Sequence, residues 1–300
     1  MIVTTVVGGH ERPTLPPGRI VNLPGRGQTF VRELPGPSGA PVLALLHGWS
    51  ATADLNWYPS FAPLAENFRV IALDHRGHGR GLRSDQRFRL EDCADDVAAL
   101  ADQLEIDHLI AVGYSMGGPI AQLLWRRHPH LVDGLVLCAT SCTFAGTLRE
   151  RMLFGMAAGT SAIAAALPVS PVAKTALTAL SRWNVRRGDP RWGIEEVSRH
   201  DWAQIIEAGR QIGQFDSRPW IGSVSVPTTV VVTDADDVVP ARRQLDLARA
   251  IPHATVRNVP NGHHDCVMVH KLFVPTLIKA CAEIAHRAAT AATSDSRVAA

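Results

Sequence analysis

The chain has 300 residues, 46% of them hydrophobic, and a formal net charge of +2 at pH 7. This length is enough for one large domain with a substantial core, or for one domain with an insert. The small net charge and the scattered arginines argue against binding of nucleic acid or another acidic polymer.

The first residues and the cysteines indicate where the protein works. Residues 1–18 contain no basic start followed by an apolar run, so no secretory signal is expected, and their proline and glycine content predicts a loose arm. The chain has five cysteines, an odd number, and most lie within apolar runs, as buried free thiols do. This usage indicates a reducing compartment, and we expect a cytoplasmic protein.

Strand-like and helix-like patterns alternate along the first half of the chain. Helical patterns such as residues 90–104 separate apolar runs that predict strands, at 29–34, 42–46, 69–73, 109–112 and 135–137. Such alternation is typical of an α/β fold in which helices cover both faces of a mostly parallel sheet.

One serine lies between a strand-like run and a helix-like stretch, in the sequence Gly113-Tyr114-Ser115-Met116-Gly117. This is the context of a nucleophile elbow, a sharp turn that presents a strained serine at the top of the sheet. Gly113 and Gly117 fit because only residues without a Cβ let the strand and the helix approach closely. A phosphate-binding turn is the alternative, but it needs a lysine after the glycines or a G-x-G-x-x-G near the first strand. The chain has neither.

The alternation stops after Thr143 and resumes with a strand at 227–233. The segment 143–225 is helix-prone, and in a chain otherwise built from strand–helix units it predicts a helical cap over the site. Residues 152–173 carry no charge, which favours an apolar lining for this lid. A membrane span is not expected there, because the stretch consists mostly of small residues and is broken by Pro168 and Pro171.

A serine nucleophile needs a base and a group that orients the base. The strand at 227–233 is followed by Asp234, Asp236 and Asp237, and the short strand at 254–259 by a polar loop with His263 and His264. Each candidate therefore lies just beyond the carboxyl end of a strand. The order serine, aspartate, histidine is the α/β-hydrolase order and differs from the chymotrypsin and subtilisin orders.

With these motifs the chain resembles the α/β-hydrolase superfamily from about residue 29 to residue 289. Two further sequences carry the resemblance: His47-Gly48-Trp49 is similar to the family's oxyanion loop, and residues 74–79 are similar to its D-x-R-G-x-G loop. The resemblance implies a mostly parallel eight-stranded sheet with helices on both faces and an inserted helical cap. It divides the chain into an N-terminal arm, a core in two parts, a cap and a tail, at residues 1–19, 20–142 with 226–290, 143–225 and 291–300.

The resemblance also implies a catalytic triad and an oxyanion hole of two backbone N–H groups that stabilise developing negative charge. The family's G-H pair matches Gly262-His263 and selects His263 as the base, with His264 as the alternative. The implied nucleophile, acid, base and two oxyanion residues are Ser115, Asp236, His263, Trp49 and Met116.

The choice of the acid has alternatives. The family usually has glycine three residues before its acid, where this chain has Thr233. Alignment on the following Val-Pro pair selects Asp236, with Asp237 the main alternative and Asp234 another. Some family members take the acid from beyond the sixth strand, but residues 137–142 contain no carboxylate.

Other histidines raise the question of a metal. His75 and His78 lie three residues apart in a glycine-rich loop, but no H-E-x-x-H helix or cysteine pair at ligand spacing accompanies them, so no metal site is predicted. Asp74 is expected to accept hydrogen bonds from loop N–H groups in a structural turn. The chemistry implied by the triad needs no cofactor.

The sequence therefore predicts a serine hydrolase that acts on small-molecule carboxylic esters with small to medium apolar acyl groups, through an acyl-enzyme. Serine at the elbow argues against the chemistry of haloalkane dehalogenases and epoxide hydrolases, in which family members carry aspartate there. Hydrolysis of enol-lactones or of carbon–carbon bonds and cofactor-free perhydrolysis use the same triad and stay open. A non-catalytic binding protein on this scaffold is a further alternative, although such proteins usually have a broken triad.

Overall fold

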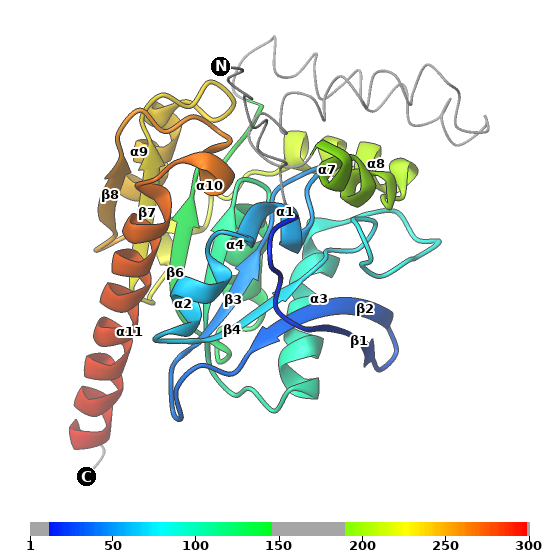
Figure 1. Ribbon diagram of the computed structural model, residues 1–300. Helices are drawn as coiled ribbons and strands as arrows, with labels where there is room; N and C mark the ends of the chain where they lie inside the picture. The colour runs from blue at the N-terminus through cyan, green and yellow to red at the C-terminus, as the bar shows by residue number, and fades with distance from the viewer. Residues whose placement is uncertain (1–11, 146–189, 299–300) are drawn as a thin grey trace, which may run out of the picture.

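The computed structural model describes residues 12–145 and 190–298, in which one sheet carries helices on both sides (Figure 1). The sheet has eight strands in the order β1-β2-β4-β3-β5-β6-β7-β8. From β1 to β8, the strands span Gly18–Leu23, Gly27–Leu34, Val42–Leu46, Arg69–Leu73, Leu109–Tyr114, Val132–Cys138, Thr228–Thr233 and Thr255–Val259.

Most of the sheet is parallel. β1 pairs antiparallel with β2, and β2 pairs antiparallel with β4, whereas the pairings from β4 across to β8 are parallel. β5 and β7 are buried along their whole length, because helices cover both faces of the parallel part. The predicted fold class, an α/β protein with a mostly parallel eight-stranded sheet, is confirmed.

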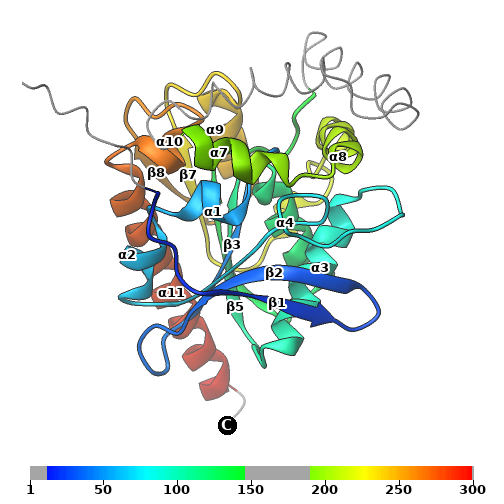
Figure 2. The ribbon, with the colours of Figure 1, turned by 45° about the vertical axis from the view of Figure 1, so that its right-hand side comes forward.

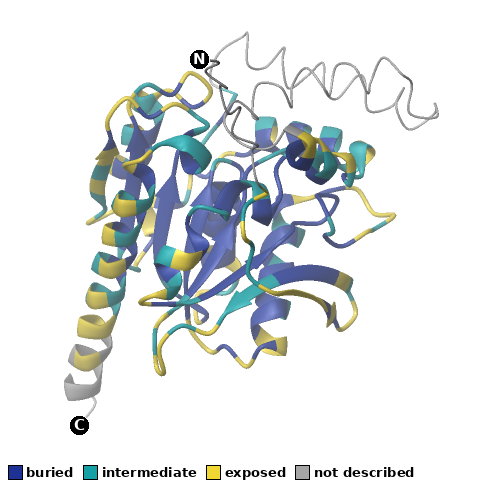
Figure 3. Ribbon diagram, in the orientation of Figure 1, coloured by how far each residue is buried: buried dark blue, intermediate teal, exposed yellow. Residues whose placement is uncertain are grey.

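The helices form two layers, which Figure 2 shows from a second side. α3, α4 and α9 pack on one face of the sheet, and α1, α2, α10 and α11 on the other. Figure 3 shows the central strands buried between these layers and exposed residues along the outer side of α11. In chain order, these helices span Ala53–Trp57 (α1), Phe61–Ala65 (α2), Leu90–Gln103 (α3), Gly117–Arg127 (α4), Ala241–Ala250 (α9), Cys266–Val269 (α10) and Phe273–Val298 (α11).

The chain leaves the sheet after β6 and returns at β7. Of the insert between them, the structure describes helices α7 (Pro190–Ser198) and α8 (Trp202–Gln214) and the short 3₁₀ helix η1 (Ile221–Ser223). Figures 1 and 2 place α7 above α1, with α8 at the same end of the sheet. The predicted apolar lid lining at 152–173 lies outside the described residues. Within the described ranges, no helix is long and apolar enough to cross a membrane.

Both ends of the described chain contain more regular structure than the sequence predicts. The predicted arm extends to residue 19, but β1 begins at Gly18 and forms a hairpin with β2. The predicted tail begins at residue 291, but α11 continues to Val298. β1 owes its conformation to pairing with another strand, and the alanine-rich end of α11 favours helix by propensity.

The cysteines are buried free thiols, as predicted: Cys93, Cys138, Cys142, Cys266 and Cys281. Burial raises the pKa of Cys266 to about 12, so this thiol stays protonated at neutral pH.

Candidate active site

Ser115 lies directly after β5 in a strained turn. Its φ angle of 52° places a non-glycine residue in the left-handed region. The Ser115 N–H donates to the Cys138 carbonyl oxygen (3.0 Å), and the Ser115 carbonyl oxygen accepts from the Gly118 N–H (2.9 Å) and from Thr140 Oγ1 (2.8 Å). Hydrogen bonds to the end of β6, to Thr140 just after it and to the start of α4 therefore stabilise the strained backbone conformation of Ser115.

The glycines beside Ser115 allow the backbones to meet. A Cβ at Gly113 would clash with the Gly117 carbonyl oxygen, and a Cβ at Gly117 would clash with the Leu46 carbonyl oxygen at the end of β3. This is the close approach of strand and helix for which the sequence predicts glycine at both positions.

His264, and not His263, is the histidine beside Ser115. His264 Nε2 lies 2.9 Å from Ser115 Oγ, and His264 Nδ1 lies 2.8 Å from Asp236 Oδ2. The neighbouring His263 is exposed. The prediction of His263 as the base, made from the family's G-H pair, is therefore wrong in its residue, and the alternative, His264, occupies the position.

The turn after β8 explains this difference of one residue. Asn261 has a φ angle of 54°, and the Cys266 N–H donates to the His263 carbonyl oxygen (3.0 Å). The Tyr114 hydroxyl, at the end of β5, donates to the His264 carbonyl oxygen (2.7 Å), and the two ring centroids lie 5.7 Å apart. Tyr114 thus holds the backbone of His264 against the strand end and leaves His263 facing solvent.

Asp236 is buried and fully hydrogen-bonded. Its Oδ2 accepts from His264 Nδ1 and from Thr233 Oγ1 (2.8 Å), and its Oδ1 accepts from the N–H groups of Val238 (2.9 Å) and Val239 (2.8 Å). Its side chain has 0% exposed surface. These four hydrogen bonds fix the orientation of the carboxylate.

The residues around Asp236 clarify the choice of acid. The alternatives Asp234 and Asp237 are both exposed. Thr233, at the position where the family usually has glycine, donates its hydroxyl hydrogen to Asp236 and accepts from Gln244 Nε2 (2.7 Å). Gln244 is buried in α9. Threonine in place of glycine at position 233 therefore links the Asp236 carboxylate to helix α9 through Gln244. Comparison of motifs could not reveal this link.

The hydrogen-bond chain assigns the protons. An ionised carboxylate only accepts, so the Nδ1 of His264 carries the hydrogen that Asp236 accepts, and Nε2 is free to accept from the Ser115 hydroxyl. This order of groups can remove the serine proton and generate a nucleophile.

The loop after β3 is held at Gly48. Asn56 Oδ1 accepts from the Gly48 N–H (2.7 Å), and the His47 Nδ1–H donates to the Gly48 carbonyl oxygen (2.8 Å). His47 Nε2 accepts from the His75 N–H (2.9 Å), which fixes the tautomer, and burial lowers the pKa of His47 to about 3. The Gly48 carbonyl and the Trp49 N–H belong to one planar peptide, so these contacts also orient the Trp49 N–H.

This loop adjoins the nucleophile. A Cβ added at Gly48 would lie 3.3 Å from Ser115 Cβ. Trp49 follows β3, and Met116 follows Ser115 at the N-terminus of α4, where backbone N–H groups have no partner within the helix. β3 and β5 are neighbouring parallel strands, so both residues lie at the same edge of the sheet.

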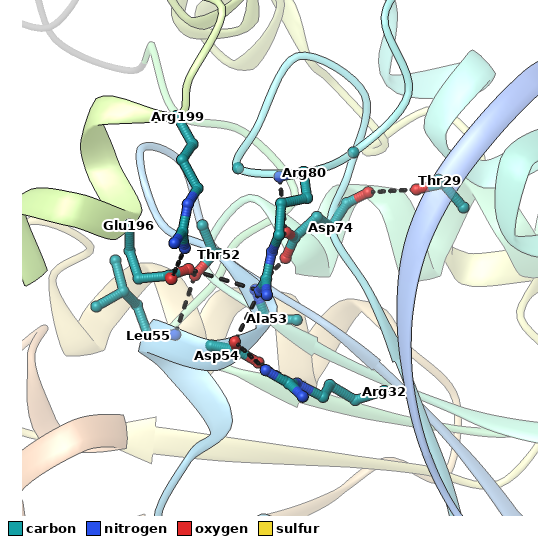
Figure 4. Close-up of polar contacts among 12 residues, drawn as sticks. Thr29, Arg32, Thr52, Ala53, Asp54, Leu55, Asp74, Arg80, Glu196 and Arg199 are labelled. Carbon is teal, nitrogen blue, oxygen red and sulfur yellow. Dashed lines mark hydrogen bonds and ion pairs between the residues drawn. The ribbon is translucent and has the colours of Figure 1, made fainter. Parts of the chain in front are cut away.

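Buried charges join helix α7 to the core (Figure 4). Glu196 in α7 accepts from Thr52 Oγ1 (3.0 Å) and lies 3.6 Å from Arg80 Nη2. The same Arg80 nitrogen pairs with Asp54 Oδ2 (2.7 Å), and Arg80 Nε lies 3.4 Å from Asp74 Oδ2. Thr52 caps α1 and Asp54 lies in its first turn, close to the loop that carries Trp49. The described part of the insert is therefore anchored next to the site.

The loop after β4 is structural at Asp74. Asp74 Oδ1 accepts from the Ala53 N–H (2.8 Å), and Oδ2 accepts from the Arg80 N–H (2.9 Å), in agreement with the predicted turn. Burial raises the pKa of Asp74 to about 6. Arg76, from the same loop, pairs with Asp96 of α3 (2.8 Å).

His75 and His78 belong to a buried group of four histidines with His47 and His200. Ring centroids lie 4.3 Å apart for His47 and His75, 5.2 Å for His47 and His78, and 5.5 Å for His78 and His200. Burial lowers the pKa of His75 and of His78 well below the usual value, and that of His200 to about 4. In the parts of the chain that the structure describes, no group of three or more histidine, cysteine or acidic side chains could hold a metal ion.

Comparisons with known proteins agree with the fold described above. A family model described as alpha/beta hydrolase fold matches residues 41–271. The chain is 26% identical over 214 residues to 3-oxoadipate enol-lactonase 2 of Acinetobacter baylyi, an alignment that covers 69% of this chain and 76% of that protein. The structure is similar to that of a thermophilic esterase from Thermogutta terrifontis, with a TM-score of 0.72, 21% identity, and coverage of 90% of this chain and 99% of that one. It is also similar to that of a hydrolase from Pseudomonas aeruginosa PA01, with a TM-score of 0.73, 21% identity, and coverage of 87% and 97%.

Proposed function

Because the chain belongs to the α/β-hydrolase family, we propose that it is a serine hydrolase that cleaves carboxylic esters with small to medium apolar acyl groups. The observation that carries this proposal is the hydrogen-bond chain from Ser115 through His264 to Asp236. A buried carboxylate, an oriented imidazole and a strained serine hydroxyl in this order are the groups that acyl transfer requires.

In the proposed reaction, Ser115 Oγ attacks the ester carbonyl carbon while His264 Nε2 takes its proton. Asp236 holds the imidazole and stabilises its positive charge. The N–H groups of Trp49 and Met116 stabilise the oxyanion that forms on the carbonyl oxygen. His264 then gives the proton to the leaving alcohol, and a water activated by the same imidazole hydrolyses the acyl-enzyme.

The substrate class is inferred from the insert and from the relatives. We assign residues 143–225 to a cap, and the uncharged sequence at 152–173 supports an apolar acyl group. The similarity to an enol-lactonase makes a cyclic ester the second candidate, since the same triad opens it. The five buried free thiols support a reducing, cytoplasmic location.

Labelling with a fluorophosphonate probe, followed by peptide mapping, tests the nucleophile. We expect an adduct on Ser115 in the wild type and none in Ser115→Ala. A folded wild type that does not react would favour a non-catalytic binding protein on this scaffold.

A series of p-nitrophenyl esters from acetate to palmitate tests the substrate class. Each buried methylene contributes about 0.8 kcal/mol, so kcat/KM should rise with acyl length until the pocket is filled and then fall. A flat profile, together with faster hydrolysis of an enol-lactone, would favour the second candidate.

A further inference from the structure

The side chain of Trp49 contacts the insert. Its indole Nε1–H donates to the carbonyl oxygen of Ile205 in α8 (2.7 Å). The two residues are 156 positions apart in the chain, so this bond joins the loop after β3 to a helix that follows β6. The loop that carries the proposed oxyanion donor is therefore in direct contact with the cap.

Gly209, about one turn after Ile205, provides the surface against which the indole packs. A Cβ at position 209 would lie 2.6 Å from Cζ2, 3.1 Å from Cη2 and 3.2 Å from Cε2 of Trp49. Carbon atoms in contact normally lie about 3.5–4.0 Å apart, so a side chain at this position would displace the ring. Glycine is less favourable than alanine inside a helix, and the close approach of the indole gives a reason for its presence here.

Helix α8 is a firm support because its N-terminal end is bonded to the loop after β4. The Asp201 side chain caps the helix, and the Asp201 N–H donates to the Gly77 carbonyl oxygen (2.8 Å). Gln204 Nε2 donates to the carbonyl oxygens of Ser84 (3.1 Å) and Gln86 (2.9 Å). A new side chain at position 209 would therefore move Trp49 more readily than it would move the helix.

We propose that α8 positions the Trp49 N–H for catalysis by holding the Trp49 indole, with Gly209 as the positioning residue. The inference rests on the proposed function, in which this N–H stabilises the oxyanion. On the N-terminal side of Trp49, Gly48 is held by hydrogen bonds. On the C-terminal side, the chain turns at Ser50, which has a φ angle of 57°. The indole contact completes the support of Trp49. An oxyanion donor acts only at hydrogen-bond distance, so a small displacement weakens stabilisation of the transition state.

The test compares Gly209→Ala with Gly213→Ala, a matched change one turn later in α8. Both variants gain helix propensity, so the second controls for that effect. We expect kcat of Gly209→Ala for a p-nitrophenyl ester to fall about tenfold with little change in KM, because the weakened interaction is made only in the transition state. Gly213→Ala should keep the kcat of the wild type.

Two variants of Trp49 show whether Gly209 acts through the indole. Trp49→Phe keeps an aromatic ring but removes the Nε1–H, and we expect a smaller loss of kcat. Trp49→Leu removes the indole and keeps the backbone N–H. In the Trp49→Leu background, Gly209→Ala should cause no further loss, because the double-mutant cycle then contains no ring to displace.

The NMR signal of the Trp49 indole N–H, assigned through Trp49→Phe, gives a readout independent of catalysis. It should move in Gly209→Ala and stay in place in Gly213→Ala. An active wild type whose kcat is unaffected by Gly209→Ala, or a further tenfold loss in the Trp49→Leu background, overturns this inference and leaves the proposed function intact. If Gly209→Ala does not fold, an unchanged kcat in Trp49→Phe overturns it. A folded wild type that neither hydrolyses esters nor reacts with a fluorophosphonate overturns the proposed function itself.

Discussion

His264 contacts both Ser115 and Asp236, so the proposed chemistry depends on it directly. His264→Ala should lower kcat for an ester by about 10³-fold or more, because the serine loses its base. His263→Ala is the matched control, and since its side chain is exposed, kcat should stay close to that of the wild type. Steady-state kinetics with a p-nitrophenyl ester measure both. The opposite pattern would mean that the loop after β8 rearranges in the working enzyme.

Thr233 is predicted to support the acid. Thr233→Val removes a hydroxyl that Asp236 and Gln244 both use, so the free energy of unfolding should fall by about 1–2 kcal/mol. kcat should fall as well, but less than in Asp236→Asn. Urea denaturation and ester kinetics measure the two effects. Thr228→Val is the control, because its hydroxyl donates to the Val226 carbonyl oxygen at the other end of β7. Equal losses of kcat in both variants would contradict the role of Thr233.

Local patterns identify the candidate residues more readily than they distinguish neighbours. The turn at Ser115 follows from its own strand and helix flanks, which lie next to it in the sequence. The choice between His263 and His264 depends on the Tyr114 hydroxyl, about 150 residues earlier in the chain, which holds the His264 carbonyl. A motif that records only a glycine and a histidine contains no information about that bond.

At the scale of elements, α7 depends on Glu196. This carboxylate is 3% exposed and contacts Thr52, Arg80 and Arg199. Glu196→Ala should lower the free energy of unfolding by about 2 kcal/mol or more, because Arg80 and Arg199 then lose a buried carboxylate partner. Glu195→Ala is the control. The Glu195 side chain is 39% exposed, so its removal should lower the free energy of unfolding by less than about 1 kcal/mol. Urea denaturation measures the stability of both variants. Equal losses of stability would show that α7 does not depend on the buried contacts of Glu196.

The strands of the sheet could be predicted from sequence because apolar runs bounded by polar loops are local signals. The prediction failed at elements whose stability comes from elsewhere. β1 carries exposed residues at four of its six positions and is stabilised by its pairing with β2. The break in alternation indicates an insert between β6 and β7, but it does not indicate the contacts of Glu196 with Thr52 or of Trp49 with Ile205, since these join distant segments.

At the scale of the whole molecule, the four buried histidines connect three segments. His47 comes from the loop after β3, His75 and His78 from the loop after β4, and His200 from the connection between α7 and α8. His200 Nδ1 accepts from the Gly79 N–H (2.8 Å), so a neutral imidazole holds the insert to the core. Protonation of these rings in place would add buried positive charges to one cluster, near the guanidinium of Arg83, which further lowers the pKa of His78 and His200.

This arrangement predicts loss of stability in mild acid. The folded-state pKa is about 3 for His47 and about 4 for His200, and burial lowers those of His75 and His78 well below 6.5. As the pH falls below about 6.5, the unfolded chain binds protons that the folded chain excludes, so stability is full above this pH and is lost below it. Asp74 acts in the opposite sense between about pH 6 and pH 4, because burial raises its folded pKa to about 6. A single carboxyl group does not offset four histidines.

Urea denaturation at pH 7.5, 6.5, 5.5 and 4.5 measures this dependence, in buffers of equal ionic strength. One buried histidine contributes a slope of up to about 1.4 kcal/mol per pH unit between the unfolded and folded pKa values. His75→Phe should reduce the slope of stability against pH by about this amount. Neither ring nitrogen of His75 has a hydrogen-bond partner among the described residues, so the change to phenylalanine breaks no hydrogen bond. His108→Gln is the control, because the His108 side chain is 64% exposed and lies outside the buried cluster. A slope that is unchanged in His75→Phe, or reduced equally in His108→Gln, would assign the acid sensitivity to groups outside the buried cluster.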